Sequence, residues 1–67
     1  MKTYLVSVDM QLFSAVVDAM RQQNIEVLQL MDTIGVLSVS CTVAQKETIE
    51  QIDGVLAVEE EGTSFAI

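Results

Sequence analysis

Apolar residues recur along this chain with two different spacings, one typical of strands and one typical of helices. Runs rich in β-forming residues predict strands at residues 2–9, 25–31, 36–41 and 55–60. Apolar residues spaced three and four positions apart predict an amphipathic helix whose apolar side consists of Leu12, Phe13, Val16, Val17 and Met20. A second helix is expected from residue 43 to about 52, with a buried stripe of Val43, Ile49 and Ile52. The predicted order is therefore β-α-β-β-α-β.

Capping residues mark the boundaries of these elements. Asp9 is placed to cap the first helix, and Asn24 suits the left-handed conformation that ends a helix. Thr42 and Gln45 have the spacing of a capping box before the second helix, and Gly54 follows the end of that helix. No proline or low-complexity segment interrupts the pattern, so we expect one domain over residues 1–61 and a tail over residues 62–67.

The predicted order consists of two split βαβ units. The two halves resemble each other, because Val6 and Val8 correspond to Leu37 and Val39 when one half is laid on the other. Right-handed crossovers place both helices on the same face of the sheet. We therefore expect an α+β fold, a ferredoxin-like sandwich with two helices on one face of a four-stranded antiparallel sheet.

Strand alternation assigns side chains to the two faces of that sheet. The face toward the helices is expected to carry Val6, Val8, Val27, Leu37, Val39, Leu56 and Val58. The open face is expected to carry Leu5, Ser7, Leu28, Leu30, Val36, Ser38, Ser40 and Ala57. This set has little charge, so it is either an ordinary half-apolar surface or a docking or dimer face. The predicted docking residues are Leu5, Leu28, Leu30, Val36 and Ala57.

The 67 residues include 10 Asp or Glu and 3 Lys or Arg, which gives a net charge of -7. This balance argues against nucleic-acid binding, which requires a basic face, and against docking on an anionic membrane. No apolar run approaches the length of a membrane span. The chain has no His, and Cys41 is its single cysteine, so the usual general base, metal ligands and disulfides are missing. We expect no enzymatic activity, no catalytic residues, no metal and no cofactor.

An acidic run, Glu59-Glu60-Glu61, ends the last predicted strand. It is either a solubilising strand end or a set of carboxylates that meets helix N-termini on a partner, where free N–H groups and the helix dipole stabilise negative charge. A metal site is less favoured, because adjacent residues of a strand point to opposite faces. Glu59 and Glu61 share a face and are the candidates for helix capping.

The last six residues, Gly62-Thr63-Ser64-Phe65-Ala66-Ile67, have no place in a four-stranded sandwich. Such an end is often frayed. However, Phe65 and Ile67 are apolar, and an extended apolar tail can add as a strand to a groove in another protein. The sequence thus allows either a frayed end or a binding segment.

Three segments of the chain stand out together, residues 1–6 (MKTYLV), 34–39 (IGVLSV) and 52–61 (IDGVLAVEEE). They resemble the subtilisin-propeptide-like inhibitor family, which comprises the ferredoxin-like prodomains of subtilisin-type serine proteases and their stand-alone inhibitor relatives. The last segment is the most telling, because the family has an apolar residue, Pro-Gly-Val, two variable residues and then Val-Glu with further acids. Asp53 stands where the family usually has Pro, Ile34 where Asn is common and Val36 where Phe is common.

The resemblance implies that the chain inhibits a subtilisin-like serine protease, assists its folding in trans, or both. The open sheet face would pack on two surface helices of the protease, with Glu59 and Glu61 near the N-termini of those helices. The tail would occupy the substrate cleft as a product-like strand, with Ile67 in the primary specificity pocket and Ser64 in a more distant apolar pocket. The implied cleft-binding residues are Thr63, Ser64, Phe65, Ala66 and Ile67.

A second class of function stays open, a small regulatory or interaction module that uses the open sheet face to form a homodimer or to bind a partner. An amino-acid-sensing module would have a Gly-rich turn after the first strand, and a copper-chaperone domain would have Cys-x-x-Cys there. Residues 9–11 are Asp-Met-Gln, which match neither pattern. No signal peptide is visible, so a cytoplasmic location is expected if the chain is full length.

Overall fold

The computed structural model describes residues 2–61. Its strands are β1 (Lys2–Val8), β2 (Glu26–Met31), β3 (Val36–Cys41) and β4 (Val55–Glu60). Its α-helices are α1 (Phe13–Gln22), which a 3₁₀ turn (Met10–Leu12) precedes, and α2 (Val43–Glu50). The predicted strands are confirmed to within a residue at each end, while the second helix ends about two residues earlier than expected.

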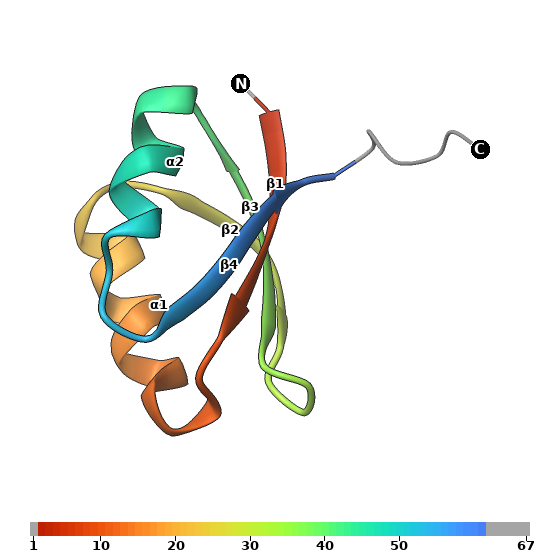
Figure 1. Ribbon diagram of the computed structural model, residues 1–67. Coiled ribbons are helices and arrows are strands. Elements are labelled where there is room, and N and C mark those ends of the chain that lie inside the picture. Colours follow the sequence, from red (N-terminus) through yellow and green to blue (C-terminus); the bar gives the residue numbers. More distant parts are fainter. Residues whose placement is uncertain (1, 62–67) are drawn as a thin grey trace.

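The four strands form one antiparallel sheet in the order β2-β3-β1-β4. Both helices cover the same face of this sheet, and no helix of residues 2–61 lies on the opposite face (Figure 1). The predicted α+β fold is confirmed, since this strand order is that of a ferredoxin-like sandwich.

The hydrophobic core lies between the two central strands and the helices. Met20, Leu37 and Ile49 are its largest fully buried side chains, and full burial of such a side chain contributes about 1.5–3 kcal/mol. The complete set of buried apolar residues is Tyr4, Val6, Val8, Val16, Val17, Met20, Ile25, Leu37, Val39, Cys41 and Ile49. Val43 was expected in this core, and that prediction is wrong: it is 54% exposed. Val43 is the first residue of α2 and lies a turn and a half before Ile49, the residue that packs inward.

The predicted caps at Asn24 and at Thr42–Gln45 are confirmed, whereas Asp9 caps the 3₁₀ turn Met10–Leu12 and α1 itself begins after Leu12 without a side-chain cap. The Asp9 carboxylate accepts a hydrogen bond of 2.9 Å from the backbone N–H of Gln11. Asn24 has a φ of 61°, the left-handed conformation expected after α1. At the start of α2, the Gln45 N–H donates to the Thr42 hydroxyl (3.1 Å), and the Thr42 N–H donates to the Gln45 side chain (3.0 Å). The capping box therefore satisfies N–H groups that the helix leaves without a partner.

Two glycines allow the loops at one end of the sheet to pack closely. Gly35 has a φ of 70° and Gly54 a φ of 104°, where side chains are disfavoured. A Cβ on Gly35 would lie 2.8 Å from the Val8 carbonyl oxygen, and one on Gly54 would lie 2.9 Å from the Leu12 Cβ. Glycine is required at both places for conformation and for space.

Both edge strands contain an irregularity that alternation did not reveal. In β2, the pairing shifts between Val27 and Gln29, so Leu28 is an extra residue and Leu30 pairs with the core residue Leu37. Leu30 therefore lies on the helix-covered face, and its predicted place on the open face is wrong. The physical reason is that one extra residue in a strand reverses the facing of the residues that follow it.

The irregularity in β4 affects Leu56. The pairing goes from Ser7–Ala57 to Val8–Val55 and skips Leu56. Val55 packs against the core instead, and Leu56 is 70% exposed. The prediction that Leu56 faces the helices is therefore wrong, because the extra residue turns it out of the ladder.

Candidate functional site

The open face of the sheet extends over all four strands. Its centre is set by the pairing of β1 with β3, where Leu5 lies opposite Ser38 and Ser7 opposite Val36. The pairing places the following residues on this face: Thr3, Leu5, Ser7, Glu26, Gln29, Met31, Val36, Ser38, Ser40, Ala57 and Glu59. Small hydroxyl side chains thus lie among aliphatic ones over the central strands, and Ser38 at the centre of this face is itself buried.

Most of the predicted docking residues lie on this face. Leu5, Val36 and Ala57 are placed there by their strand pairing. Leu28 lies at the bulge of β2 and is about half exposed. Leu30 does not belong to this set, because it faces α1. The open face is therefore less aliphatic along β2 than the sequence suggested, and Gln29 and Met31 contribute there instead.

The acidic run divides between the two faces of the sheet. Glu59 pairs with Leu5 and lies on the open face, whereas Glu60 pairs with Tyr4 on the helix side. The Glu60 carboxylate lies 3.3 Å from the ammonium nitrogen of Lys2. The N–H of Glu61 donates to the Thr3 carbonyl (2.8 Å), so the bonding of β4 to β1 continues past the end of the strand. Within residues 2–61, neither Glu59 nor Glu61 forms a salt bridge with a basic side chain.

The predicted cleft-binding residues Thr63, Ser64, Phe65, Ala66 and Ile67 lie outside the described residues. They follow in the sequence directly after Gly62 and the acidic end of β4. Their proposed role rests on sequence alone.

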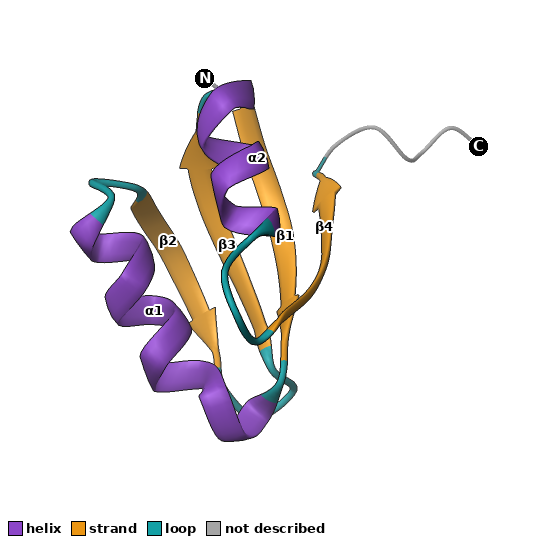
Figure 2. Ribbon diagram, turned by 60° about the vertical axis from the view of Figure 1, so that its left-hand side comes forward, coloured by secondary structure: helices purple, strands orange, loops and turns teal. Residues whose placement is uncertain are grey.

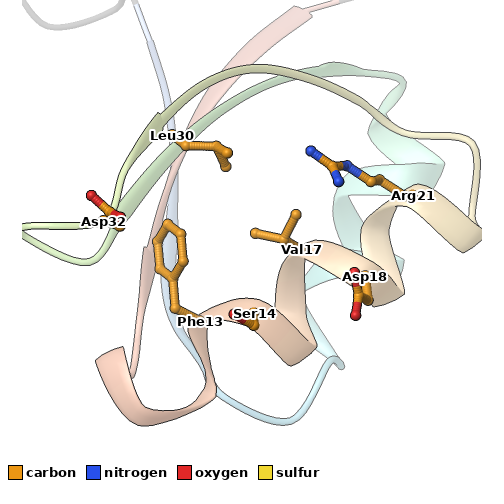
Figure 3. A pocket seen from close by; sticks show the side chains of 7 residues that line it. All are labelled: Phe13, Ser14, Val17, Asp18, Arg21, Leu30 and Asp32. Carbon is orange, nitrogen blue, oxygen red and sulfur yellow. The ribbon is translucent and has the colours of Figure 1, made fainter.

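A shallow groove of about 280 Å³ lies on the other side of the sheet, between α1 and β2. Phe13 and Val17 of α1 and Leu30 of β2 form its apolar floor (Figure 3). Arg21 and Asp32 lie at opposite ends of this floor (Figure 3). Leu30 faces the helices, but α1 does not cover it fully, and its side chain is 46% exposed. The groove is the space left between α1 and β2.

The described part of the chain offers little for chemistry. Cys41 is fully buried, and burial raises the pKa of its thiol, so the reactive thiolate is disfavoured. Among residues 2–61, no group of three or more His, Cys, Asp or Glu side chains could hold a metal ion. No helix of this part is long and apolar enough to span a membrane.

Sequence reasoning missed three exposed apolar residues, Met10, Ile34 and Leu56, which the loops at one end of the sheet bring to the surface. One signal was present in the sequence: Ile34 stands directly before Gly35 in a turn, where polar residues predominate. No signal identified Leu56, because its exposure depends on the bulge in β4.

Comparison of the chain with family models, curated proteins and solved structures finds no match.

Proposed function

We propose that this chain inhibits a subtilisin-like serine protease by occupying its substrate cleft, and that it can assist the folding of that protease in trans. The observation that carries the proposal is the open sheet face, uncovered by helices and rich in small and aliphatic side chains, with the carboxylate of Glu59 on that same face. A partner that lies on this face would meet an apolar centre and an acidic border.

The charge arrangement at the end of β4 supports this mode of binding. Glu60 is engaged with Lys2 on the helix side, so Glu59 is the carboxylate of β4 that the open face presents. Alternation assigns Glu61 to the same side as Glu59. Two carboxylates at one border of an apolar face are suited to the N-termini of helices on a partner, where exposed N–H groups bind anions.

The position of the tail in the sequence supports competitive inhibition. Residues 63–67 follow the acidic run in the sequence after Gly62, and their run of Thr, Ser, Phe, Ala and Ile contains no charged side chain. An extended segment of this kind can pair with the edges of a protease cleft through main-chain hydrogen bonds. The folded domain would hold the segment in place, which reduces the entropy lost on binding. Inhibition would require no chemistry from this chain.

Titration of the full chain against several subtilisin-type proteases, with a peptide substrate, tests the proposal. We expect inhibition that is competitive with the substrate. Deletion of residues 63–67 should abolish inhibition and leave the far-ultraviolet circular dichroism unchanged, since the described fold ends before the tail. Absence of inhibition for every protease would overturn the proposal, and unchanged inhibition by the truncated chain would exclude the cleft mechanism.

Substitutions in the tail refine the test. A β-branched residue fits a large, open specificity pocket poorly, so Ile67→Tyr or Ile67→Leu should tighten the inhibition of a broad-specificity subtilisin. Ser64→Ala or Ser64→Val should do the same at the more distant apolar pocket. Inhibition constants measured under identical conditions decide this, and equal constants for all four variants and the parent would place these side chains outside the pockets.

A further inference from the structure

Three loops meet at the end of the sheet where β1 ends and β4 begins (Figure 2). They are residues 9–12 between β1 and α1, the turn 32–35 between β2 and β3, and the segment that leads from α2 into β4. Two backbone hydrogen bonds of 2.8 Å tie them together, from the Val8 N–H to the Gly35 carbonyl and from the Asp9 N–H to the Gly54 carbonyl. These loops therefore form one continuous surface.

This surface carries the three most exposed large apolar side chains among residues 2–61. Leu56 is 70% exposed, Ile34 65% and Met10 57%, and we call these residues the loop-end patch. The Met10 side chain lies against Gly35, next to Ile34 in sequence. The turn before β3 and the start of β4 are separated by two strand spacings, about 10 Å. Isolated exposed apolar residues are ordinary, but here Met10 and Ile34 stand on the bonded loops and Leu56 at the start of β4, at the same end of the sheet. Three such residues at one end form a patch typical of an interaction site.

The charges around the loop-end patch all have one sign. Asp9, Asp32 and Asp53 stand on its three loops. The three basic residues of the chain lie elsewhere: Lys2 begins β1 at the opposite end, Arg21 stands in the last turn of α1, and Lys46 of α2 forms an ion pair with Glu50. The patch thus has an apolar centre and an exclusively acidic border.

We propose that the loop-end patch is a docking surface for a protein that presents an aliphatic patch bordered by Lys or Arg. Interfaces combine an apolar centre with a polar rim, and complementary rim charges select the partner. A second copy of this chain fits poorly, because it would bring identical carboxylates face to face. This surface lies at the end of the sheet where β4 begins, whereas Glu59, the carboxylate used in the proposed inhibition, stands near the other end of β4.

An amphipathic helical peptide built from Leu and Lys serves as the probe, and its twin with Glu in place of Lys serves as the control. Each is titrated into the nitrogen-15-labelled full chain, and amide shifts are followed by NMR. We expect the Leu/Lys peptide to shift amides of residues 9–12, 32–35 and 53–56, with binding at least about tenfold tighter than that of the Glu twin. Shifts confined to the open sheet face, or equal binding of both peptides, would overturn the proposal.

Matched variants separate this patch from the general acidity of the chain. Ile34→Ser and Leu56→Ser remove exposed side chains, so the fold should persist, and each should weaken binding of the Leu/Lys peptide by about fivefold or more. Val43→Ser is the control, because Val43 is similarly exposed (54%) but begins α2 at the opposite end of the sheet. All three variants should inhibit a sensitive protease like the parent. If Ile34→Ser and Leu56→Ser bind the Leu/Lys peptide as tightly as the parent does, the docking proposal is refuted, whether or not the inhibitor proposal holds.

Discussion

At the scale of single residues, the environment decides what each polar group can do. Glu60 lies on the helix side beside Lys2, whereas its neighbour Glu59 lies on the open face. Cys41 is fully buried on the core face of β3, where burial disfavours the thiolate. Adjacent residues of a strand therefore differ in their surroundings, because alternation sends them to opposite faces of the sheet.

The first prediction concerns the two carboxylates proposed to cap helices of a partner. Glu59→Gln and Glu61→Gln should each weaken protease inhibition by about 0.3–2 kcal/mol at low salt. The loss should shrink as salt is added, because salt screens exposed charges. Inhibition constants at two salt concentrations measure this, with Glu47→Gln on the exposed side of α2 as the control. If both variants inhibit as strongly as the parent at low salt, the acidic run is only a solubilising strand end.

A second prediction concerns the Cys41 thiol. Its pKa is raised by burial, so the native chain at mildly alkaline pH holds little thiolate, and the sulfur is also inaccessible. Reaction with a disulfide reagent should be at least about tenfold slower in the native chain than in urea. Absorbance of the released thiol follows the reaction. Equal rates in the two conditions would show that Cys41 is accessible in the native chain.

At the scale of elements, the edge strands differ most from a regular pattern. The central strands β1 and β3 alternate without interruption over Lys2–Ser7, while β2 and β4 each contain an extra residue. Bulges are common at sheet edges, where they increase twist and discourage pairing with other chains. They also decide which leucines the surface presents, since Leu28 and Leu56 stand at the two irregularities.

The third prediction separates the two faces of β2. Leu30 packs toward α1 and is about half buried, so Leu30→Ser should lower the free energy of unfolding by about 1 kcal/mol. Leu28→Ser should change stability less and should weaken protease inhibition instead. Urea unfolding and inhibition constants of both variants test this contrast. If the two stability effects were reversed, Leu28 would be the residue that packs inward.

The fourth prediction concerns the capping box of α2. Thr42→Ala removes the acceptor for the Gln45 N–H, and loss of such a cap costs about 0.5–2 kcal/mol of stability. Thr48→Ala is a suitable control, since the Thr48 hydroxyl bonds only to the Ala44 carbonyl within the helix (3.3 Å). Thermal unfolding midpoints compare the two. A midpoint for Thr42→Ala equal to that of Thr48→Ala would show that the cap contributes little.

At the scale of the whole molecule, a small domain carries a net charge of -7. Two salt bridges, Lys2–Glu60 and Lys46–Glu50, join opposite charges within residues 2–61. Most other charged groups are carboxylates, which repel one another in the folded state.

The fifth prediction follows from this repulsion. Raising sodium chloride from about 10 to 200 mM shortens the screening length roughly from 30 to 7 Å. The unfolding midpoint should therefore rise by several degrees, because screening weakens repulsion among carboxylates more than it weakens two exposed ion pairs. Thermal circular dichroism at both concentrations measures the change. A midpoint that falls with salt would show that the ion pairs outweigh the repulsion.

The sequence alone determined most of the fold. The apolar periods located the strands and helices, and Asn24 and the Thr42–Gln45 box marked their boundaries correctly, while Asp9 caps the 3₁₀ turn before α1. Local hydrogen bonding and backbone preference act over a few residues, so a local pattern is enough to predict them. The order β-α-β-β-α-β, with the handedness of crossovers, then led to the predicted four-stranded antiparallel sheet with both helices on one face, which the structure confirms.

Only the tertiary structure decided which side chains form the surfaces. Alternation placed Leu30 on the open face and Leu56 in the core, and a single extra residue in each edge strand reversed both assignments. The meeting of three loops likewise brought Met10, Ile34 and Leu56 to one end of the molecule from distant places in the sequence. Periodicity carries no information about strand register or about contacts between loops, because both depend on how partner strands pair across the sheet.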